Sequence, residues 1–466
     1  MCRKRKKRCD GTKPHCTACT STGKQAECHY SEEDALEGEA QLKQRISELE
    51  ARLRAYGHRE GVDSTATSSS TTRLTPAEHP CIPETEDVVN AGRAFLMHRA
   101  QVGLCLTQER LLAIEKRDYS VVHPALLHAT ILYGTIILEF TNQIGRDGLE
   151  LESHLLGCAI RELHEPKIDS TTAIEAHQML CKYYWWRGEI LMAREHIMKA
   201  SHIAIEKNIA LLPSVQILQQ HSMYRRVTLA LDKDVSAICQ LLYMDQAQSI
   251  ACFNPLIFPE RYYNELALLP NFYTALCVES FAVAARSISL LLYRTTMTTL
   301  SSLEGKDCCD ISSAQWHSKT EDMRLRIRQH VDAVEIRLMT TVLTADIMQL
   351  RALKIAKMIA LGALIEIHAV LAPLDDSIRE ETIAMITGVI SIAQSFELDD
   401  YPKLCPLVAL PFSASVKVVS EEVRSGGSNL TVAELNTILG EIDNCLTLLQ
   451  TKLSPHIVCS PVVTLI

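Results

Sequence analysis

Five cysteines lie within the first 28 residues at a spacing of C-x6-C-x6-C-x2-C-x8-C. They are Cys2, Cys9, Cys16, Cys19 and Cys28. Six consecutive basic residues, Arg3-Lys4-Arg5-Lys6-Lys7-Arg8, fill the gap between the first two. Thiolates at short, regular spacing are typical zinc ligands, and an uninterrupted basic run beside them favours a polyanion partner. Residues 1–28 are therefore predicted to form a zinc module that contacts phosphates and bases.

Charge is distributed unevenly along the chain. Residues 1–28 hold eight Lys/Arg and two acidic residues, a net charge of +6. Since the whole chain carries −9, the remainder carries −15. A small basic head on a large acidic body argues for a polyanion partner at the head only.

The other twelve of the seventeen cysteines are scattered, mostly in apolar helical surroundings such as Cys158, Cys181, Cys239 and Cys277. No signal peptide precedes them, so we expect reduced core residues of an intracellular protein rather than a disulfide framework. No apolar run reaches eighteen residues, and we expect no membrane association.

The bulk of the chain is predicted to be mostly α. Aromatic residues make up only 5% of the sequence, and helical spacing of apolar residues dominates after residue 88. We expect a large all-helical domain over 88–454, with a possible subdivision in the turn-rich Thr295–Lys306, and a loosely tied tail over 455–466. Catalytic motifs such as H-E-x-x-H, the Walker loop and G-x-S-x-G are missing, so no enzyme is expected.

A short heptad seam follows the basic head. Its apolar positions are Leu42, Ile46, Leu49 and Leu53. The seam predicts a short coiled coil over 42–56 that dimerises the chain. Because two heptads are marginal alone, an amphipathic helix packed on its own chain is the alternative.

Two linkers flank this seam. Residues 29–41 are acidic, and residues 57–87 combine a Ser/Thr tract with three prolines. The second segment has nothing to bury, so it is predicted to be a flexible, disordered linker.

The head resembles the fungal zinc binuclear cluster (Zn2Cys6) family of transcription factors, whose pattern is C-x2-C-x6-C-x5–12-C-x2-C-x6–8-C. The five cysteines match the second to sixth of that pattern, and the Cys9-Asp10-Gly11 step, Lys13 and the loop residue Pro14 match as well. By resemblance, a complete cluster holds two Zn²⁺ ions, one bound by Cys2, Cys9 and Cys16 and the other by Cys16, Cys19 and Cys28. The first cysteine of the pattern would stand before Met1, so either the true N-terminus lies upstream or the module is degenerate.

The resemblance also implies how DNA is read. In this family a short helix after the second cysteine points its N-terminal end into the major groove. Arg5 and Lys6 fall where base contacts to a CGG-like triplet are made, and Lys or Arg donors suit guanine O6 and N7. The remaining basic residues, expected at phosphates, are Arg3, Lys4, Lys7, Arg8 and Lys13. A nuclear import signal is the alternative interpretation of the run, and either one predicts the nucleus.

A weaker resemblance lies in the body. Residues 183–200 are similar to a helix pair in the regulatory region that often follows this cluster in fungi. Trp185 and Trp186 are expected to pack in the core rather than form a ligand cage. Cys308-Cys309, in a turn-rich loop, is a further candidate for metal binding or oxidation.

Two functions are therefore weighed. The first is a sequence-specific RNA polymerase II transcription factor that binds double-stranded DNA as a homodimer and contacts the transcription machinery or co-regulators. The second is a helical nuclear scaffold or co-regulator with a degenerate zinc head that acts through protein–protein contacts alone.

Overall fold

The computed structural model describes residues 17–21, 85–140, 148–211, 225–301, 314–344, 346–372, 376–398, 400–401, 404–426 and 430–452. The chain divides into two compact units, Met1–His79 and Pro80–Ile466. The predicted linkers, the coiled coil, Cys308-Cys309 and the tail lie outside the described residues, apart from the end of the second linker (85–87).

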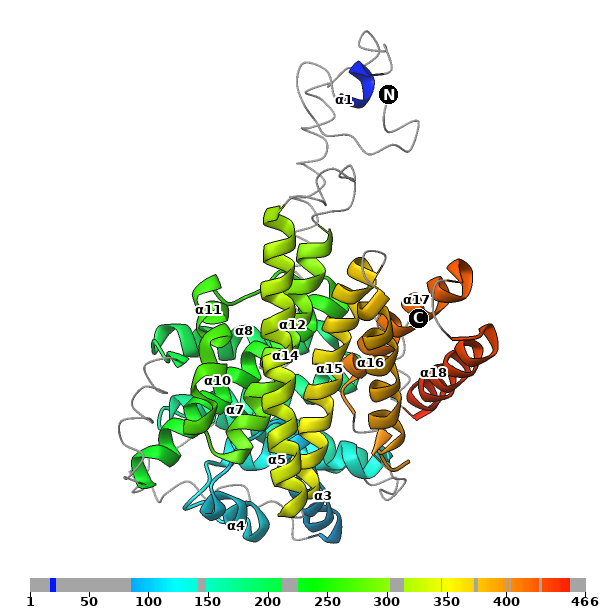
Figure 1. Ribbon diagram of the computed structural model, residues 1–466. Helices are drawn as coiled ribbons and strands as arrows, with labels where there is room; N and C mark the ends of the chain where they lie inside the picture. Colours follow the sequence, from blue (N-terminus) through cyan, green and yellow to red (C-terminus); the bar gives the residue numbers. More distant parts are fainter. Residues whose placement is uncertain are drawn as a thin grey trace, which may run out of the picture. The chain divides into compact units, whose positions relative to one another are not determined.

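All regular structure in the described ranges is helical, which confirms the mostly α prediction (Figure 1). The first unit contributes α1 (Thr17–Thr20). The first half of the second unit contains α3 (Glu86–Val102), α4 (Gln108–Lys116), α5 (Pro124–Phe140), α6 (Gly148–Glu162), α7 (Ser170–Trp186), α8 (Ile190–Glu206) and α10 (Arg225–Cys252). The second half contains α11 (Glu260–Leu268), η2 (Leu269–Ala275), α12 (Val278–Ser301), α14 (Ala314–Leu343), α15 (Ile347–Leu371), α16 (Asp376–Gln394), η5 (Pro406–Val408), α17 (Ala409–Ser425) and α18 (Val432–Lys452).

Helix α15 is the centre of the second unit. Its residues are apolar on almost every face and most are buried, as expected of a helix surrounded by others. It packs on α12, α14, α16, α17 and α3. The helix begins where the side chain of Asp346 accepts a hydrogen bond from the backbone N–H of Gln349 at 3.1 Å. Gly362 permits the contact with α17, because a Cβ there would lie 2.9 Å from Cα of Pro411.

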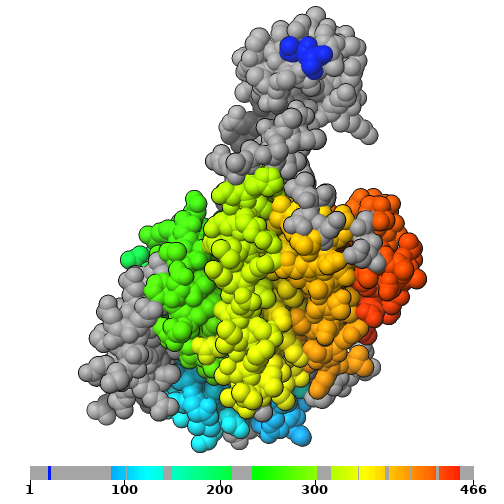
Figure 2. Space-filling model, in the orientation of Figure 1, coloured from blue at the N-terminus to red at the C-terminus, as the bar shows by residue number. Residues whose placement is uncertain are grey.

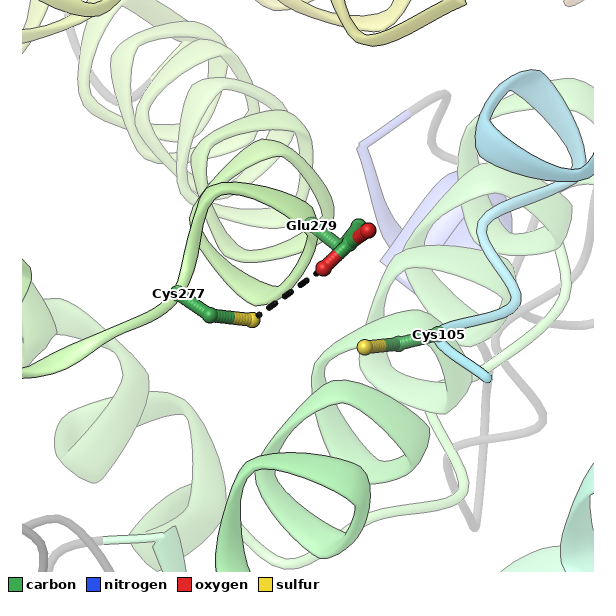
Figure 3. Close-up of side chains that lie close together, drawn as sticks. All are labelled: Cys105, Cys277 and Glu279. Atoms are coloured by element: carbon green, nitrogen blue, oxygen red, sulfur yellow. Dashed lines mark hydrogen bonds between the residues drawn. The ribbon is translucent and has the colours of Figure 1, made fainter. Parts of the chain in front are cut away.

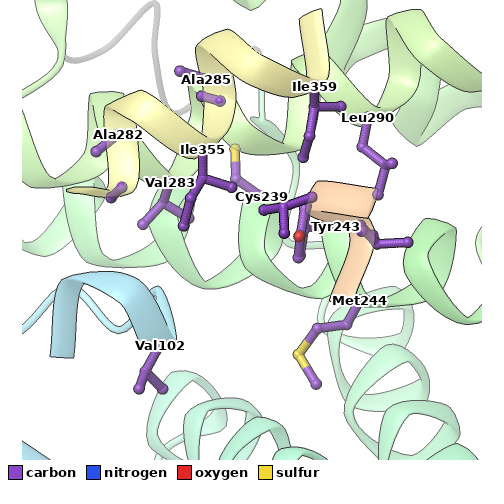
Figure 4. Close-up of a cluster of buried hydrophobic side chains, with 14 of the residues drawn as sticks. Val102, Cys239, Tyr243, Met244, Ala282, Val283, Ala285, Leu290, Ile355 and Ile359 are labelled. Atoms are coloured by element: carbon purple, nitrogen blue, oxygen red, sulfur yellow. The ribbon is translucent and has the colours of Figure 1, made fainter. Parts of the chain in front are cut away.

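The largest helix–helix contact joins α12 to α15. Figure 4 shows Ala282 and Ala285 of α12 near Ile355 and Ile359 of α15, with Cys239 of α10 beside them. Small residues on α12 let the helices approach closely, and each large apolar side chain buried there contributes about 1.5–3 kcal/mol. The α12–α15 pair therefore forms the core on which the other helices pack.

Helices α7 and α8 form the helix pair that the sequence predicts at 183–200. They pack extensively on each other and are joined by a turn at Gly188, whose φ is 75°. The side chain of Asp169 begins α7 by accepting from the N–H of Thr172 at 3.0 Å.

The subdivision expected within Thr295–Lys306 is wrong. Residues 80–466 form one compact unit, and α12 continues to Ser301. The hydroxyls of Thr295 and Thr298 donate to the carbonyls of Leu291 and Arg294, one turn back, at 2.8 and 2.9 Å. These threonines therefore extend the helix instead of forming a turn.

The face drawn in Figure 2 has α14 along its middle and α18 at one edge, and helices of the first half of the unit, in blue and cyan, lie along its lower edge. Within the described ranges, no helix is both long and apolar enough to span a bilayer.

Candidate functional site

The described part of the head is a single helical turn. Helix α1 follows directly on Cys16 in the sequence and carries Cys19, whose side chain is 4% exposed. Cys19 is the one predicted zinc ligand within the described residues. Those outside them are Cys2, Cys9, Cys16 and Cys28.

The predicted DNA contacts and dimer residues also lie outside the described residues. The base contacts are Arg5 and Lys6, and the dimer residues are Leu42, Ile46, Leu49 and Leu53. The phosphate contacts are Arg3, Lys4, Lys7, Arg8 and Lys13.

The donor set fits zinc. A C-x2-C pair in which a helical turn carries the second cysteine is a common way to present two thiolates to one tetrahedral ion. Cys19 is buried, and few residues of the head are apolar. Zinc bound there would supply the folding free energy that such a small module lacks.

A second candidate site lies in the helical body. It is a cavity of about 100 Å³ between α7, α10, α12 and η5. Its walls are mainly apolar and aromatic, and two cationic side chains, Lys182 and Arg286, line it. No aspartate or glutamate stands among its described lining residues.

The ammonium group of Lys182, a residue of α7, lies at the C-terminal end of α3. It donates to the carbonyl of Val102, in the last turn of α3, where the helix dipole is negative. Burial lowers the pKa of Lys182 well below its usual range, and the nearby Arg286 lowers it further. The ammonium form is thus stabilised by a carbonyl but opposed by desolvation and by a like charge.

Arg286 is 2% exposed and is positioned by two neighbours on α10. Its guanidinium donates to Oε1 of Gln240 and lies 4.5 Å from the ring centroid of Tyr243. The hydroxyl of Tyr243 donates to Sγ of Cys405 at 2.9 Å. Gly103, with φ 82°, packs against this group, because a Cβ there would overlap both Gln240 and Arg286.

Both tryptophans of the predicted helix pair line the cavity. Trp186 is 8% exposed, and its indole N–H donates to the hydroxyl of Tyr133 at 3.0 Å. Trp185 is half-buried and packs against the core. The expected packing role is therefore correct, and the same rings also form a wall of the cavity.

Sequence reasoning missed Lys182 and Arg286. The sequence gives little indication of their role. Lys182 is the one charged residue of the apolar stretch Leu180–Trp186, and Arg286 is the one charged residue of Phe281–Leu292. Such a charge predicts a buried partner but does not identify it.

Known proteins resemble part of this chain. The family model of the fungal Zn(2)-Cys(6) binuclear cluster domain matches residues 1–35. The chain is similar to Transcription factor MAR1 of Candida glabrata, with 37% identity over 79 residues, which is 15% of this chain and 6% of that protein. The chain thus spans a small fraction of the curated relative that it matches. No solved structure matches it. Residues 1–35 are a fungal Zn(2)-Cys(6) binuclear cluster domain, a domain that holds two zinc ions.

Proposed function

We propose that the protein is a sequence-specific DNA-binding regulator of RNA polymerase II transcription that works in the nucleus. The observation that carries this proposal is the zinc cluster domain at residues 1–35 with its run of six basic residues. The similarity to a transcription factor supports it.

Base reading is assigned to Arg5 and Lys6, whose donors suit guanine O6 and N7 of a CGG-like triplet. The neighbouring basic residues and Lys13 contact phosphates and fix the register. One triplet gives limited selectivity, since each wrong base pair costs about 1–3 kcal/mol. A homodimer formed through the seam Leu42–Leu53 reads two triplets and roughly doubles that discrimination.

The test is titration of the zinc-loaded full chain with fluorescent duplexes that carry two CGG triplets, one triplet or none. We expect tighter binding to CGG DNA and loss of binding after chelation of zinc. Arg5→Ala should relax the preference for CGG, whereas Lys13→Ala should weaken all duplexes equally and reduce the salt slope by about one unit. Equal affinity for all duplexes would refute sequence-specific recognition.

We further propose that the helical body binds a small organic anion in the cavity lined by Lys182 and Arg286. The observation that favours this function is the pair of cationic side chains, Lys182 and Arg286, in a cavity whose described lining has no carboxylate. A carboxylate placed there would meet two donors in a low dielectric, where ionic hydrogen bonds are strong.

The size of the cavity limits the ligand. An apolar cavity of about 150 Å³ accepts benzene, so a cavity of about 100 Å³ suits a carboxylate smaller than benzene, with a short aliphatic chain. The rings of Trp185 and Trp186 would contact its apolar part.

Propionate and propionamide, which share a shape but differ in charge, provide the experiment. Propionate should raise the melting temperature of the full chain in proportion to the logarithm of its concentration, and propionamide should not. Lys182→Met should abolish the effect of propionate, while Lys199→Met, at an exposed residue of α8, should leave it unchanged. An equal response to both ligands would contradict the proposal.

A further inference from the structure

Three side chains with metal-binding atoms converge at the start of α12. Cys105 lies in the loop after α3, Cys277 immediately precedes α12, and Glu279 is in its first turn. Their sulfur and carboxylate oxygen atoms all lie within 4.8 Å of one another. Figure 3 shows the two sulfur atoms directed toward each other, with the Glu279 carboxylate beside them. All three side chains are half-buried.

The hydrogen bonds hold these side chains in place. The thiol of Cys277 lies 3.6 Å from Oε2 of Glu279. The hydroxyl of Ser280 lies 3.6 Å from Sγ of Cys105 and 3.4 Å from Sγ of Cys277. The backbone N–H of Ser280 donates to Sγ of Cys277 at 3.4 Å, so this sulfur occupies the capping position of α12. A helix N-terminus stabilises the thiolate form of a cysteine, which is the form that binds metals.

The cluster is also rich in potential negative charge. Its three side chains carry −3 when fully ionised, and the neighbouring Ser280 is neutral. The hydrogen bond with Cys277, burial and the negative charge of Glu279 all raise the pKa of the Cys105 thiol. A divalent cation among the three groups would remove this repulsion and favour the thiolates.

We propose that Cys105, Cys277 and Glu279 bind a Zn²⁺ ion in the helical body, separate from the two ions of the head. Binding joins each sulfur and one carboxylate oxygen to the metal and releases the two thiol protons to solvent. The fourth position is left for a water molecule or for the hydroxyl of Ser280.

The geometry requires little rearrangement. At a Zn–S distance of about 2.3 Å, a tetrahedral site places its ligand atoms about 3.8 Å apart. The present separations, at most 4.8 Å, reach this value through side-chain rotation. Two thiolates and one carboxylate suit zinc better than Mg²⁺ or Ca²⁺, which prefer all-oxygen sites.

Such an ion would connect distant parts of the chain. Cys105 and Ser280 are 175 residues apart in sequence. Zinc would therefore fasten the α3–α4 connection to the N-terminus of α12, the helix that makes the largest contact with α15. Because the metal binds the folded form, it should raise the stability of the body.

The experiment measures zinc per chain in the full protein after loading and removal of free metal. We expect three ions in the natural chain, two in Cys277→Ser and three in Cys252→Ser, a matched control at a half-buried cysteine of α10. The difference between the two variants isolates the body site. This difference in zinc content stays at one ion per chain even if the head binds less than two ions. Failure of the head to bind zinc and failure of the body site are therefore distinguishable.

Cobalt provides the second measurement. With Co²⁺ in place of Zn²⁺, the thiolate-to-metal absorption should decrease in Cys277→Ser, and Glu279→Gln should weaken Co²⁺ affinity at least tenfold while leaving the thiols in place. The Glu279→Gln measurement remains decisive if Cys277→Ser fails to fold. Equal zinc content in Cys277→Ser and Cys252→Ser would overturn the proposal. A Cys105–Cys277 disulfide in the metal-loaded chain would overturn it as well.

Discussion

The carboxylate of Asp245 on α10 accepts a hydrogen bond from the guanidinium of Arg194 on α8, at 3.1 Å. The Asp245 side chain is completely buried. Its second oxygen accepts from the hydroxyl of Tyr263 at 2.6 Å and from the backbone N–H groups of Ile257 and Phe258 at 2.8 and 3.1 Å. A single carboxylate thus joins α8, α10, α11 and the connection between the last two helices.

Replacement of this carboxylate should be severely destabilising. Asp245→Ala leaves Arg194 without its ionic partner and leaves the Tyr263 hydroxyl and two backbone N–H groups without their acceptor. Removal of one partner of a buried ion pair costs about 3–5 kcal/mol. The free energy of unfolding measured in urea should fall by that amount. Glu195→Ala is the control, because its ion pair with Lys199 is about half exposed and should contribute less than about 0.5 kcal/mol. Similar losses in the two variants would contradict this account of Asp245.

Two glycines with positive φ give a matched pair of variants. Gly103→Ala and Gly426→Ala both place a side chain in the left-handed region, at φ 82° and 64°, which costs about 1–2 kcal/mol. At Gly426 the new methyl group meets nothing within 4 Å, whereas at Gly103 it overlaps Gln240 and Arg286. Gly103→Ala should therefore cost about 1–3 kcal/mol more, the usual range for overpacking. Equal urea midpoints for the two variants would show that the side chains of Gln240 and Arg286 move away from the new methyl group at no cost in stability.

A buried histidine should make the fold sensitive to acid. His330 on α14 is 1% exposed and lies between the hydroxyls of Tyr273 and Ser289, at 2.7 and 2.8 Å. Burial lowers its pKa to about 4. The unfolded chain, with an ordinary histidine pKa of about 6.5, binds a proton below that pH while the folded chain does not. The stabilisation is therefore complete above about pH 6.5 and is lost as the pH falls toward 4.

The variant His330→Gln keeps a donor and an acceptor but does not titrate. Its free energy of unfolding should depend less steeply on pH between 6.5 and 4, by about 1.4 kcal/mol per pH unit. Urea titrations at several pH values measure this slope. His202→Gln, at a residue 76% exposed on α8, should keep the slope of the natural chain. An unchanged slope in His330→Gln would show that His330 is protonated in the folded protein.

The sequence predicted what depends on local spacing. The zinc cluster is defined by the intervals between five cysteines, and helices such as α7 and α8 follow from the periodicity of their own residues. The cavity depends instead on contacts between distant residues. Lys182 donates to a carbonyl 80 residues away, and Arg286 donates to Gln240, 46 residues away. Neither partner follows from a motif, because the Val102 carbonyl becomes an acceptor only where α3 ends at Gly103.

The same reason explains why the sequence missed the Cys105–Cys277–Glu279 cluster. The sequence predicts Cys277 to be an ordinary core residue, and Cys105 belongs to no metal-binding motif. Only the packing of the α3–α4 connection against the start of α12 brings the two sulfurs together. The turn expected near the end of α12 was wrong for a local reason. Threonine is common both in turns and at helix ends, and the hydrogen bonds of its hydroxyl decide which of the two forms.

The last prediction concerns the cysteine of the head that the structure describes. Cys19→Ser removes a soft thiolate from a cluster in which metal binding and folding are coupled, so the head should lose one or both zinc ions. Affinity for CGG duplexes should fall to that of the chelated protein, while the far-ultraviolet circular dichroism of the helical body stays unchanged. Cys158→Ser, at a buried cysteine of α6, is the control and should retain both zinc and DNA binding. Full zinc content and CGG affinity in Cys19→Ser would exclude Cys19 as a ligand, because a hydroxyl does not replace a thiolate in such a cluster.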